Sequence, residues 1–214
     1  MYTPKHFIEN DPARIAGIIE HYSFATLLSA AADGIQITHA PLVLDATRGP
    51  HGTLVGHIAR ANPHAAALAD GSTATAIFHG PHGYISPTWY GDQNPKVPNV
   101  PTWNYVALHV HGRVSRIEDP AAKLAIVRDL AGRFESPGEA GWKPGDATAH
   151  AAQLAAIVGF EIAVERIEAK AKLSQNRSVN DRRRVIAALA AGPHPDGKAM
   201  AAWMQADLEG STGS

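Results

Sequence analysis

FATLLSAAADGIQITHAPLVL, residues 24–44, contains two strand patterns separated by a turn. Residues 24–29 are mostly apolar, and Ala32-Asp33-Gly34 is typical of a hairpin turn. The chain then resumes over residues 34–44 as a second strand, in which successive side chains point to opposite faces. This stretch therefore predicts an antiparallel hairpin.

Similar strand patterns recur along the chain, with helices at its beginning, between the late strands and at its end. Further strands are predicted at 53–59, 73–78, 103–117 and 160–167. Helices are predicted at 12–21, 63–70, 120–134, from 148 to before 159, 179–191 and 199–208. Residues 79–101 hold five of the fifteen prolines, so we expect a loop there.

Short strands joined by hairpins, with helices attached, favour an antiparallel β-barrel of the α+β class. The chain has 214 residues, of which 45% are hydrophobic and 18% charged, as is typical of globular proteins. We expect one main domain over residues 1–178 and a helical extension over residues 179–214.

Charge and cysteine content exclude several classes of protein. The formal net charge of −1 excludes a wholly basic nucleic-acid-binding surface. The absence of cysteine excludes disulfides, thiolate zinc sites, iron–sulfur clusters and a cysteine nucleophile. The first residues do not resemble a signal peptide, and every apolar run is short, so we expect a cytoplasmic protein that does not cross a membrane.

An anion site is suggested where the third predicted strand ends and a helix begins, over residues 56–64. Free N–H groups at a helix start favour an anion, and Arg60 can add a bidentate cation. His57 or Asn62 can add a neutral donor. The alternative is that Arg60 is merely solvated and that Asn62 only caps the helix.

Twelve histidines require a metal site to be considered. His109 and His111 would place two imidazoles on one face of a strand, about 7 Å apart. A third ligand would have to come from elsewhere, such as His57 or His39, and no specific metal-binding motif occurs. We therefore expect half-buried strand histidines rather than a dedicated metal site. No residue stands out as a catalytic nucleophile, acid or base.

A basic segment and two aromatic segments are further candidates. Residues 166–184 contain seven Lys or Arg and two acidic residues, which suits an anionic ligand or a nucleic acid. Arg182, Arg183 and Arg184 cannot all face one DNA groove, because consecutive helical residues point about 100° apart, so we favour a solvated helix face over DNA binding. Arg182 shares a face with Ile186 and Leu189, and we expect it to anchor the helix locally. The segments 84–90 and 101–105 place aromatic planes beside polar groups, which suits a flat heteroaromatic ligand or ordinary packing.

Five segments in order resemble the PaiB family, described as FMN-binding negative transcriptional regulators with a flavin-reductase-like split barrel. The resemblance spans about residues 1–190. Its segments are Met1-Tyr2-x-Pro4-x-His6-Phe7, Gly56-His57-Ile58-Ala59-Arg60-Ala61-Asn62-Pro63, Gly80-Pro81-x-x-Tyr84-Ile85-Ser86-Pro87-x-Trp89-Tyr90, Val100-Pro101-Thr102-Trp103-Asn104-Tyr105 and Lys172-Leu173-Ser174-Gln175-Asn176-Arg177.

The resemblance implies a homodimeric split barrel with FMN held between subunits. The implied FMN contacts are the strand residues Thr38 and His39, the turn residues His57, Arg60 and Asn62, the aromatic segment Trp103, Asn104 and Tyr105, and Lys172 and Gln175. Oxidase relatives carry Arg and Lys where this chain has His39 and Leu42. The phosphate charge must therefore be balanced elsewhere, or the flavin binds weakly.

The implied function is a flavin- or redox-linked regulator without a DNA-binding domain of its own. Direct DNA binding is not expected, because no helix-turn-helix is evident and the net charge is −1. One alternative is a flavin-dependent oxidoreductase acting on a small molecule. The other is a haem-binding or haem-degrading split-barrel protein, which the histidine content suggests.

Overall fold

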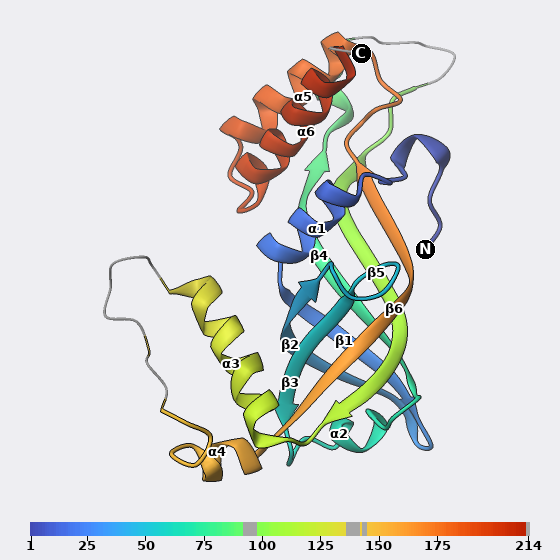
Figure 1. Ribbon diagram of the computed structural model, residues 1–214. Coiled ribbons are helices and arrows are strands. Elements are labelled where there is room, and N and C mark those ends of the chain that lie inside the picture. Colours follow the sequence, from blue (N-terminus) through green and yellow to red (C-terminus); the bar gives the residue numbers. More distant parts are fainter. Residues whose placement is uncertain (92–97, 136–141, 143–144, 213–214) are drawn as a thin grey trace. The chain divides into compact units, whose positions relative to one another are not determined.

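Six antiparallel strands form a closed barrel in the order β1-β2-β3-β6-β5-β4 (Figure 1). The computed structural model describes residues 1–91, 98–135, 142 and 145–212. The strands are β1 (Phe24–Ala31), β2 (Gly34–Asp45), β3 (Thr53–Ala59), β4 (Thr73–Ile85), β5 (Thr102–Ile117) and β6 (Ile157–Lys172). The predicted antiparallel α+β barrel is confirmed.

The register of the first hairpin decides which side chains face outward. Ala31 pairs with Gly34 beside the turn, and Phe24 pairs with Pro41 at the far end. Gly34 has a φ of 130°, which a side chain would disfavour. Along β2, Ile35 and Ile37 are exposed, whereas residues on the other face enter the core.

Eight helical segments accompany the barrel in the described part of the chain. They are η1 (Lys5–Phe7), α1 (Pro12–His21), α2 (His64–Ala67), η2 (Pro87–Trp89), α3 (Pro120–Phe134), α4 (Ala151–Ala155), α5 (Val179–Ala191) and α6 (Gly197–Thr212). Side-chain caps begin three of them: Ser86 accepts from the Thr88 N–H, Asp119 from the Ala122 N–H, and Ser178 from the Asp181 N–H. Among the described residues, no helix is long and apolar enough to cross a membrane.

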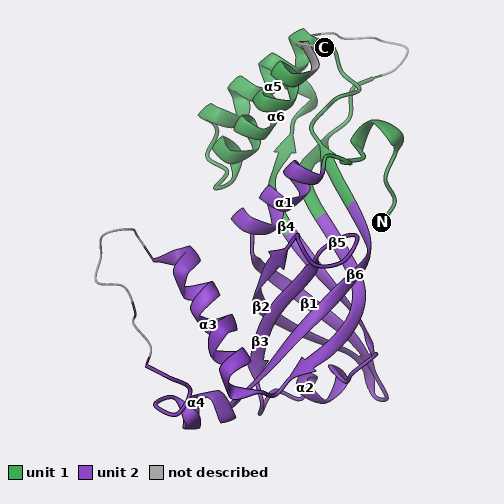
Figure 2. Cartoon of the chain, in the orientation of Figure 1, with its two compact units in different colours: residues 1–11, 79–107, 169–214 green, residues 12–78, 108–168 purple. Residues whose placement is uncertain are grey.

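Two compact units divide the chain, and three of their four limits fall within strands β4, β5 and β6 (Figure 2). Unit 1 contains residues 1–11, 79–107 and 169–214, and unit 2 contains residues 12–78 and 108–168. Fully buried side chains in unit 2 include Leu27, Phe78 and Phe160. In unit 1, α5 and α6 contribute the buried Leu189 and Met204. The domain boundary predicted at residue 178 stays a prediction.

The loop predicted over residues 79–101 is wrong at its beginning, because β4 continues to Ile85. Gly80 lets β5 approach closely: a Cβ at this position would lie 2.9 Å from the Cβ of Val106. Gly80 thus serves close backbone packing within a strand instead of a turn. Residues 92–97 of the predicted loop lie outside the described residues.

Several predicted boundaries also differ from the structure. Strand β6 extends beyond the predicted 160–167 at both ends, and α6 extends beyond 199–208. The predicted helices at 63–70 and from 148 are shorter, since α2 spans four residues and α4 spans five. Element ends are where local pattern is weakest and tertiary packing decides.

Candidate functional site

The turn from β3 into α2, in unit 2, brings together Thr38, Asn62 and His64. Asn62 Nδ2 donates to Thr38 Oγ1 at 3.0 Å, and His64 Nδ1 lies 2.9 Å from the same hydroxyl. Asn62 Oδ1 accepts from the His64 backbone N–H. The predicted pair Thr38 and Asn62 is therefore joined by His64, which sequence reasoning missed. We call these three residues the Thr38 cluster.

His64 contributes a buried nitrogen to the Thr38 cluster. The residue is 1% exposed, and its Nε2 has no hydrogen-bond partner among the described residues. Burial lowers the pKa of His64, which favours the neutral imidazole. If Thr38 donates to Nδ1, the imidazole proton lies on Nε2 and forms a buried donor without a partner.

His57 lies on β3 and lines a different cavity of unit 2. This cavity has a volume of about 340 Å³ and is bordered by the apolar Leu124, Val127 and Ile157. Burial lowers the pKa of His57, and its Nδ1 is buried without a partner among the described residues. His57 is consequently a neutral side chain against an apolar wall.

Arg60 is held by an ion pair and by backbone carbonyls of unit 2. Its Nη2 lies 2.5 Å from Glu118 Oε2, and Nη1 lies 3.3 Å from Oε1. Its Nε donates to the Ala155 carbonyl, and Nη2 also donates to the Ile157 carbonyl. Four of the five guanidinium N–H groups thus have acceptors. Hydrogen bonds from Arg60 and then Arg116 lower the pKa of Glu118 to about 2.

A cavity of about 560 Å³ borders Arg60, and Lys123 also lines it. Lys123 is buried, and its Nζ donates to the Leu154 carbonyl at 2.6 Å. The cavity leaves room for a ligand, but both of these cations already have acceptors. An anion here would have to compete with Glu118.

His39 lies apart from the Thr38 cluster because neighbouring strand residues face opposite ways. Its ring stacks on Phe24 with centroids 6.2 Å apart, and its Nδ1 lies 3.2 Å from Thr26 Oγ1. His39 therefore belongs to the outer face of the β1–β2 hairpin.

Unit 1 contains two neighbouring cations, Lys170 and Lys172, which we call the lysine pair. They lie two residues apart near the end of β6, so they share a face of the strand. Lys172 Nζ donates to Thr102 Oγ1 and, at 2.8 Å, to the Trp103 carbonyl. Lys170 Nζ donates to the Tyr2 carbonyl at 3.2 Å. The family resemblance implies Lys172 as an FMN contact, whereas Lys170 is indicated only as part of the basic segment 166–184.

The charge of the lysine pair is not balanced by a carboxylate among the described residues. Lys170 is 6% exposed, and its Nζ lies 5.0 Å from the ring centroid of Tyr105 and 5.9 Å from that of Phe7. Burial, and then repulsion from Lys170, lower the pKa of Lys172. The pair therefore combines one buried and one half-buried positive charge with aromatic surfaces.

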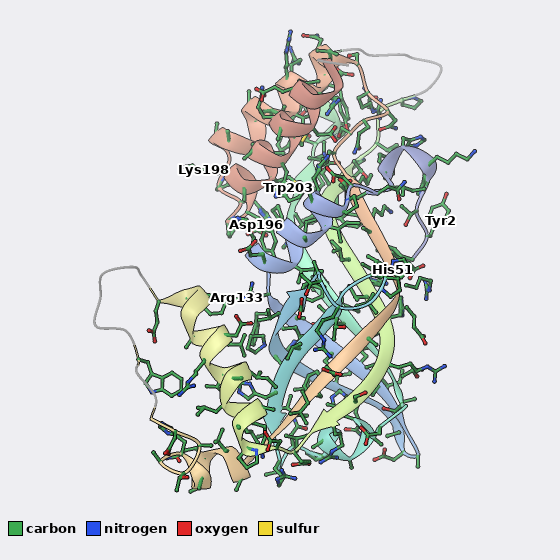
Figure 3. All side chains as sticks on the ribbon, viewed as in Figure 1. Tyr2, His51, Arg133, Asp196, Lys198 and Trp203 are labelled. Carbon is green, nitrogen blue, oxygen red and sulfur yellow. The ribbon has the colours of Figure 1, made fainter. Side chains whose placement is uncertain are left out.

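Trp103 is the centre of an exposed aromatic group in unit 1. Its ring centroid lies 6.1 Å from that of Tyr84 and 5.9 Å from that of His82. His82 in turn lies 2.9 Å from Asp196 Oδ2 (Asp196 is labelled in Figure 3). Trp103 is 47% exposed and Tyr84 42% exposed, which leaves their planes accessible to a flat ligand.

The side chains of Asn104 and Gln175 form hydrogen bonds with the protein's own backbone and core. Asn104 is fully buried, and its Nδ2 donates to Ser174 Oγ at 2.9 Å and to Met204 Sδ. Gln175 accepts from the Leu173 N–H and donates to the Ala171 carbonyl, closing the end of β6. In this conformation Asn104 therefore affects ligand binding only through the residues that it contacts, and not by touching a ligand itself.

Two of the three arginines of α5 have partners within unit 1. Arg182 is buried and lies 2.7 Å from Asp207 Oδ2, and Arg184 Nε donates to the Trp89 carbonyl. Arg182 anchors the helix pair locally, as its shared face with the apolar residues of α5 predicts.

Comparison with known proteins gives matches in both sequence and structure. A family described as "Putative FMN-binding domain" matches residues 1–166. "Protease synthase and sporulation protein PAI 2" of Bacillus subtilis (strain 168) is 33% identical over 211 residues, which cover 98% of this chain and 99% of that protein. An uncharacterized Aspergillus fumigatus protein is 32% identical, and the match covers 71% of this chain and 75% of that protein.

Two solved structures share the fold at low sequence identity. The flavocytochrome Anf3 from Azotobacter vinelandii has a TM-score of 0.62 at 13% identity, covering 85% of this chain and 78% of that chain. The FAD and heme binding protein from Mycobacterium smegmatis has a TM-score of 0.59 at 16% identity, covering 86% of this chain and 80% of that chain. These likenesses show a common split-barrel fold.

Proposed function

Because this chain belongs to the PaiB family of FMN-binding split-barrel proteins, we propose that it binds FMN and acts as a flavin-linked regulator in the cytoplasm. Bound flavin supplies electron transfer, and the protein binds and orients it. The regulatory role is suggested by the resemblance to the PaiB family, and it is proposed to operate without direct DNA binding.

The lysine pair is the observation that carries this proposal. FMN ends in a phosphate, which needs positive charge and N–H donors, and its ring system needs an apolar or aromatic surface. Lys170 and Lys172 offer charge that no described carboxylate neutralises, beside the Tyr105 ring. Trp103 adds an exposed plane within the same unit. We propose that the lysine pair binds the FMN phosphate.

The residues of unit 2 that the resemblance implies are proposed as further FMN contacts and are tested separately. Thr38 and Asn62 offer a hydroxyl and an amide, and His64 adds a buried nitrogen that has no partner in the described part of the chain. Arg60 is the weakest of these candidates, because binding phosphate would require it to give up Glu118. His39, His57 and Gln175 stay predictions that rest on the resemblance.

We propose that the protein is a homodimer that uses the outer face of the β1–β2 hairpin. Phe24, Ile35 and Ile37 are 69%, 68% and 58% exposed on this face. Apolar side chains gathered on a surface favour a protein interface, because burying apolar surface stabilises the complex by about 25 cal/mol for every Å² removed from water. The family resemblance implies a dimer on independent grounds.

The visible absorption spectrum of purified full-length protein tests the proposal. Titration with FMN is expected to shift and structure the flavin bands and to saturate at one FMN per chain. An unchanged spectrum, together with complete loss of FMN on dialysis, would contradict flavin binding. Steady oxidation of NADH or NADPH by the FMN-loaded protein would instead favour the oxidoreductase alternative.

A further inference from the structure

His109 and His111 of β5 lie beside Glu168 of β6, all within unit 2. The candidate ligand atoms of these three side chains lie within 4.8 Å of one another, and each residue is partly buried. The sequence suggested His57 or His39 as a third ligand, whereas in the structure the acidic side chain beside both histidines is Glu168. We propose that His109, His111 and Glu168 bind a divalent transition metal ion, with Zn²⁺ as the best match.

The distances within this triad are close to those of a coordinated metal. Glu168 Oε2 lies 3.0 Å from His111 Nε2 and 3.9 Å from His109 Nδ1. In tetrahedral coordination with bonds of about 2.0–2.2 Å, ligand atoms lie about 3.3–3.6 Å apart. A metal ion therefore needs only small side-chain adjustments, because the carboxylate already faces both imidazoles.

Neighbouring side chains orient the ligands as the surroundings of a metal site do. Thr75 Oγ1 lies 2.9 Å from His111 Nδ1, so a proton on Nδ1 has an acceptor while Nε2 keeps its lone pair for the metal. Arg166 Nη1 lies 2.9 Å from Glu168 Oε1, which leaves Oε2 as the oxygen nearest the imidazoles. Each contact therefore engages the atom that is not proposed to bind the metal, Nδ1 of His111 and Oε1 of Glu168.

The donor set selects the class of metal. Two imidazoles and one carboxylate suit Zn²⁺, Co²⁺ or Ni²⁺, whereas Mg²⁺ and Ca²⁺ prefer oxygen ligands. Three protein ligands leave at least one position for water or an external ligand. The side chains of His109, His111 and Glu168 are 29%, 25% and 25% exposed, so solvent can reach that position.

A metal titration of the untagged full-length chain tests the site without using FMN. After removal of metal with a chelator, calorimetry is expected to show one Zn²⁺ per chain. Co²⁺ is expected to give the visible bands of a four- or five-coordinate ion. His111→Gln and Glu168→Gln are each expected to weaken Zn²⁺ at least about tenfold and to abolish the Co²⁺ bands.

Two further variants test the positioning of His111 and control for nonspecific metal binding by surface histidines. Thr75→Val retains all three ligands but removes the partner of His111 Nδ1, and it is expected to weaken Zn²⁺ about tenfold. His51→Gln changes an exposed histidine of the same unit (Figure 3) and is expected to leave affinity unchanged. Absence of stoichiometric Zn²⁺ binding, or equal affinity in wild type and folded His111→Gln, would overturn the proposal.

Discussion

The guanidinium of Arg60 and the carboxylate of Glu118 face each other through two contacts, the shorter being 2.5 Å. This pair neutralises the cation that the sequence indicated most strongly as a phosphate ligand. The lysine pair of unit 1 has no such carboxylate among the described residues. The positive charge available to an anion therefore lies in a different place from the one that the turn at residues 56–64 predicts.

Arg60→Ala is expected to change the dissociation constant of FMN less than about threefold. The variant loses an exposed, solvent-screened ion pair and two contacts to backbone carbonyls, so stability falls modestly. Fluorescence titration with FMN measures the affinity, and urea unfolding measures stability. A loss of affinity of about 1–3 kcal/mol would show that Arg60 leaves Glu118 to bind phosphate.

Stability is expected to fall with decreasing pH through His57 and His64. Burial lowers the pKa of both below the usual 6.5. Between the folded and the unfolded pKa the unfolded chain binds more protons, so the free energy of unfolding decreases as the pH falls below about 6.5. Urea unfolding across this range measures the slope.

Replacement of either His57 or His64 reports on the cause of that slope. His64→Gln and His57→Gln are each expected to flatten the pH dependence below about pH 6.5, whereas His51→Gln is expected to leave it unchanged because His51 is exposed. A slope identical to wild type in both buried-site variants would assign the pH dependence to other groups.

Asn104→Ala is expected to lower the free energy of unfolding by about 1–3 kcal/mol, because Ser174 loses its buried partner. Ser115→Ala changes an exposed residue of the same strand and is expected to cost less than about 0.5 kcal/mol. Chemical denaturation compares the two variants. Equal stability of Asn104→Ala and wild type would show that this buried hydrogen bond does not support unit 1.

Ile37→Asp is expected to convert the proposed dimer into a monomer. The substitution places a charge in the centre of the apolar face formed with Phe24 and Ile35, where burial of an unpaired carboxylate is costly. Light scattering coupled to gel filtration measures the mass. The exposed Gln205→Asp in α6 serves as the control. A wild-type monomer, or a dimeric Ile37→Asp variant, would remove this face as the interface.

Local sequence patterns were sufficient to predict most strands of the barrel and the start of α3. The alternation around Gly34 predicts the first hairpin, and Asp119-Pro120 predicts where α3 begins, because turn and capping chemistry depends on neighbouring residues. Gly80 misled the prediction, since a glycine that admits a neighbouring strand looks the same in sequence as a glycine in a loop.

Contacts across the sheet could not be read from the chain. Glu168 and His111 are separated by 57 residues and meet only because β6 lies beside β5. Likewise, the sequence of the basic segment 166–184 reveals its positive charge, but it does not reveal which of its cations will lie beside a carboxylate. Arg182 pairs with Asp207, whereas Lys172 donates to Thr102 and a carbonyl. Strand order and partner identity are tertiary properties.

Parallel titration of FMN and riboflavin into wild type, Lys172→Met and Lys198→Met tests the central claim most directly, because the two ligands differ only in the phosphate. Lys198 is an exposed lysine of α6 and serves as the matched control (Figure 3). We predict that wild type and Lys198→Met prefer FMN, and that Lys172→Met loses about 1.5–3 kcal/mol of FMN binding while its riboflavin affinity is unchanged. Equal affinity of wild type for both flavins, or an undiminished preference for FMN in Lys172→Met, would contradict the claim that the lysine pair binds the phosphate.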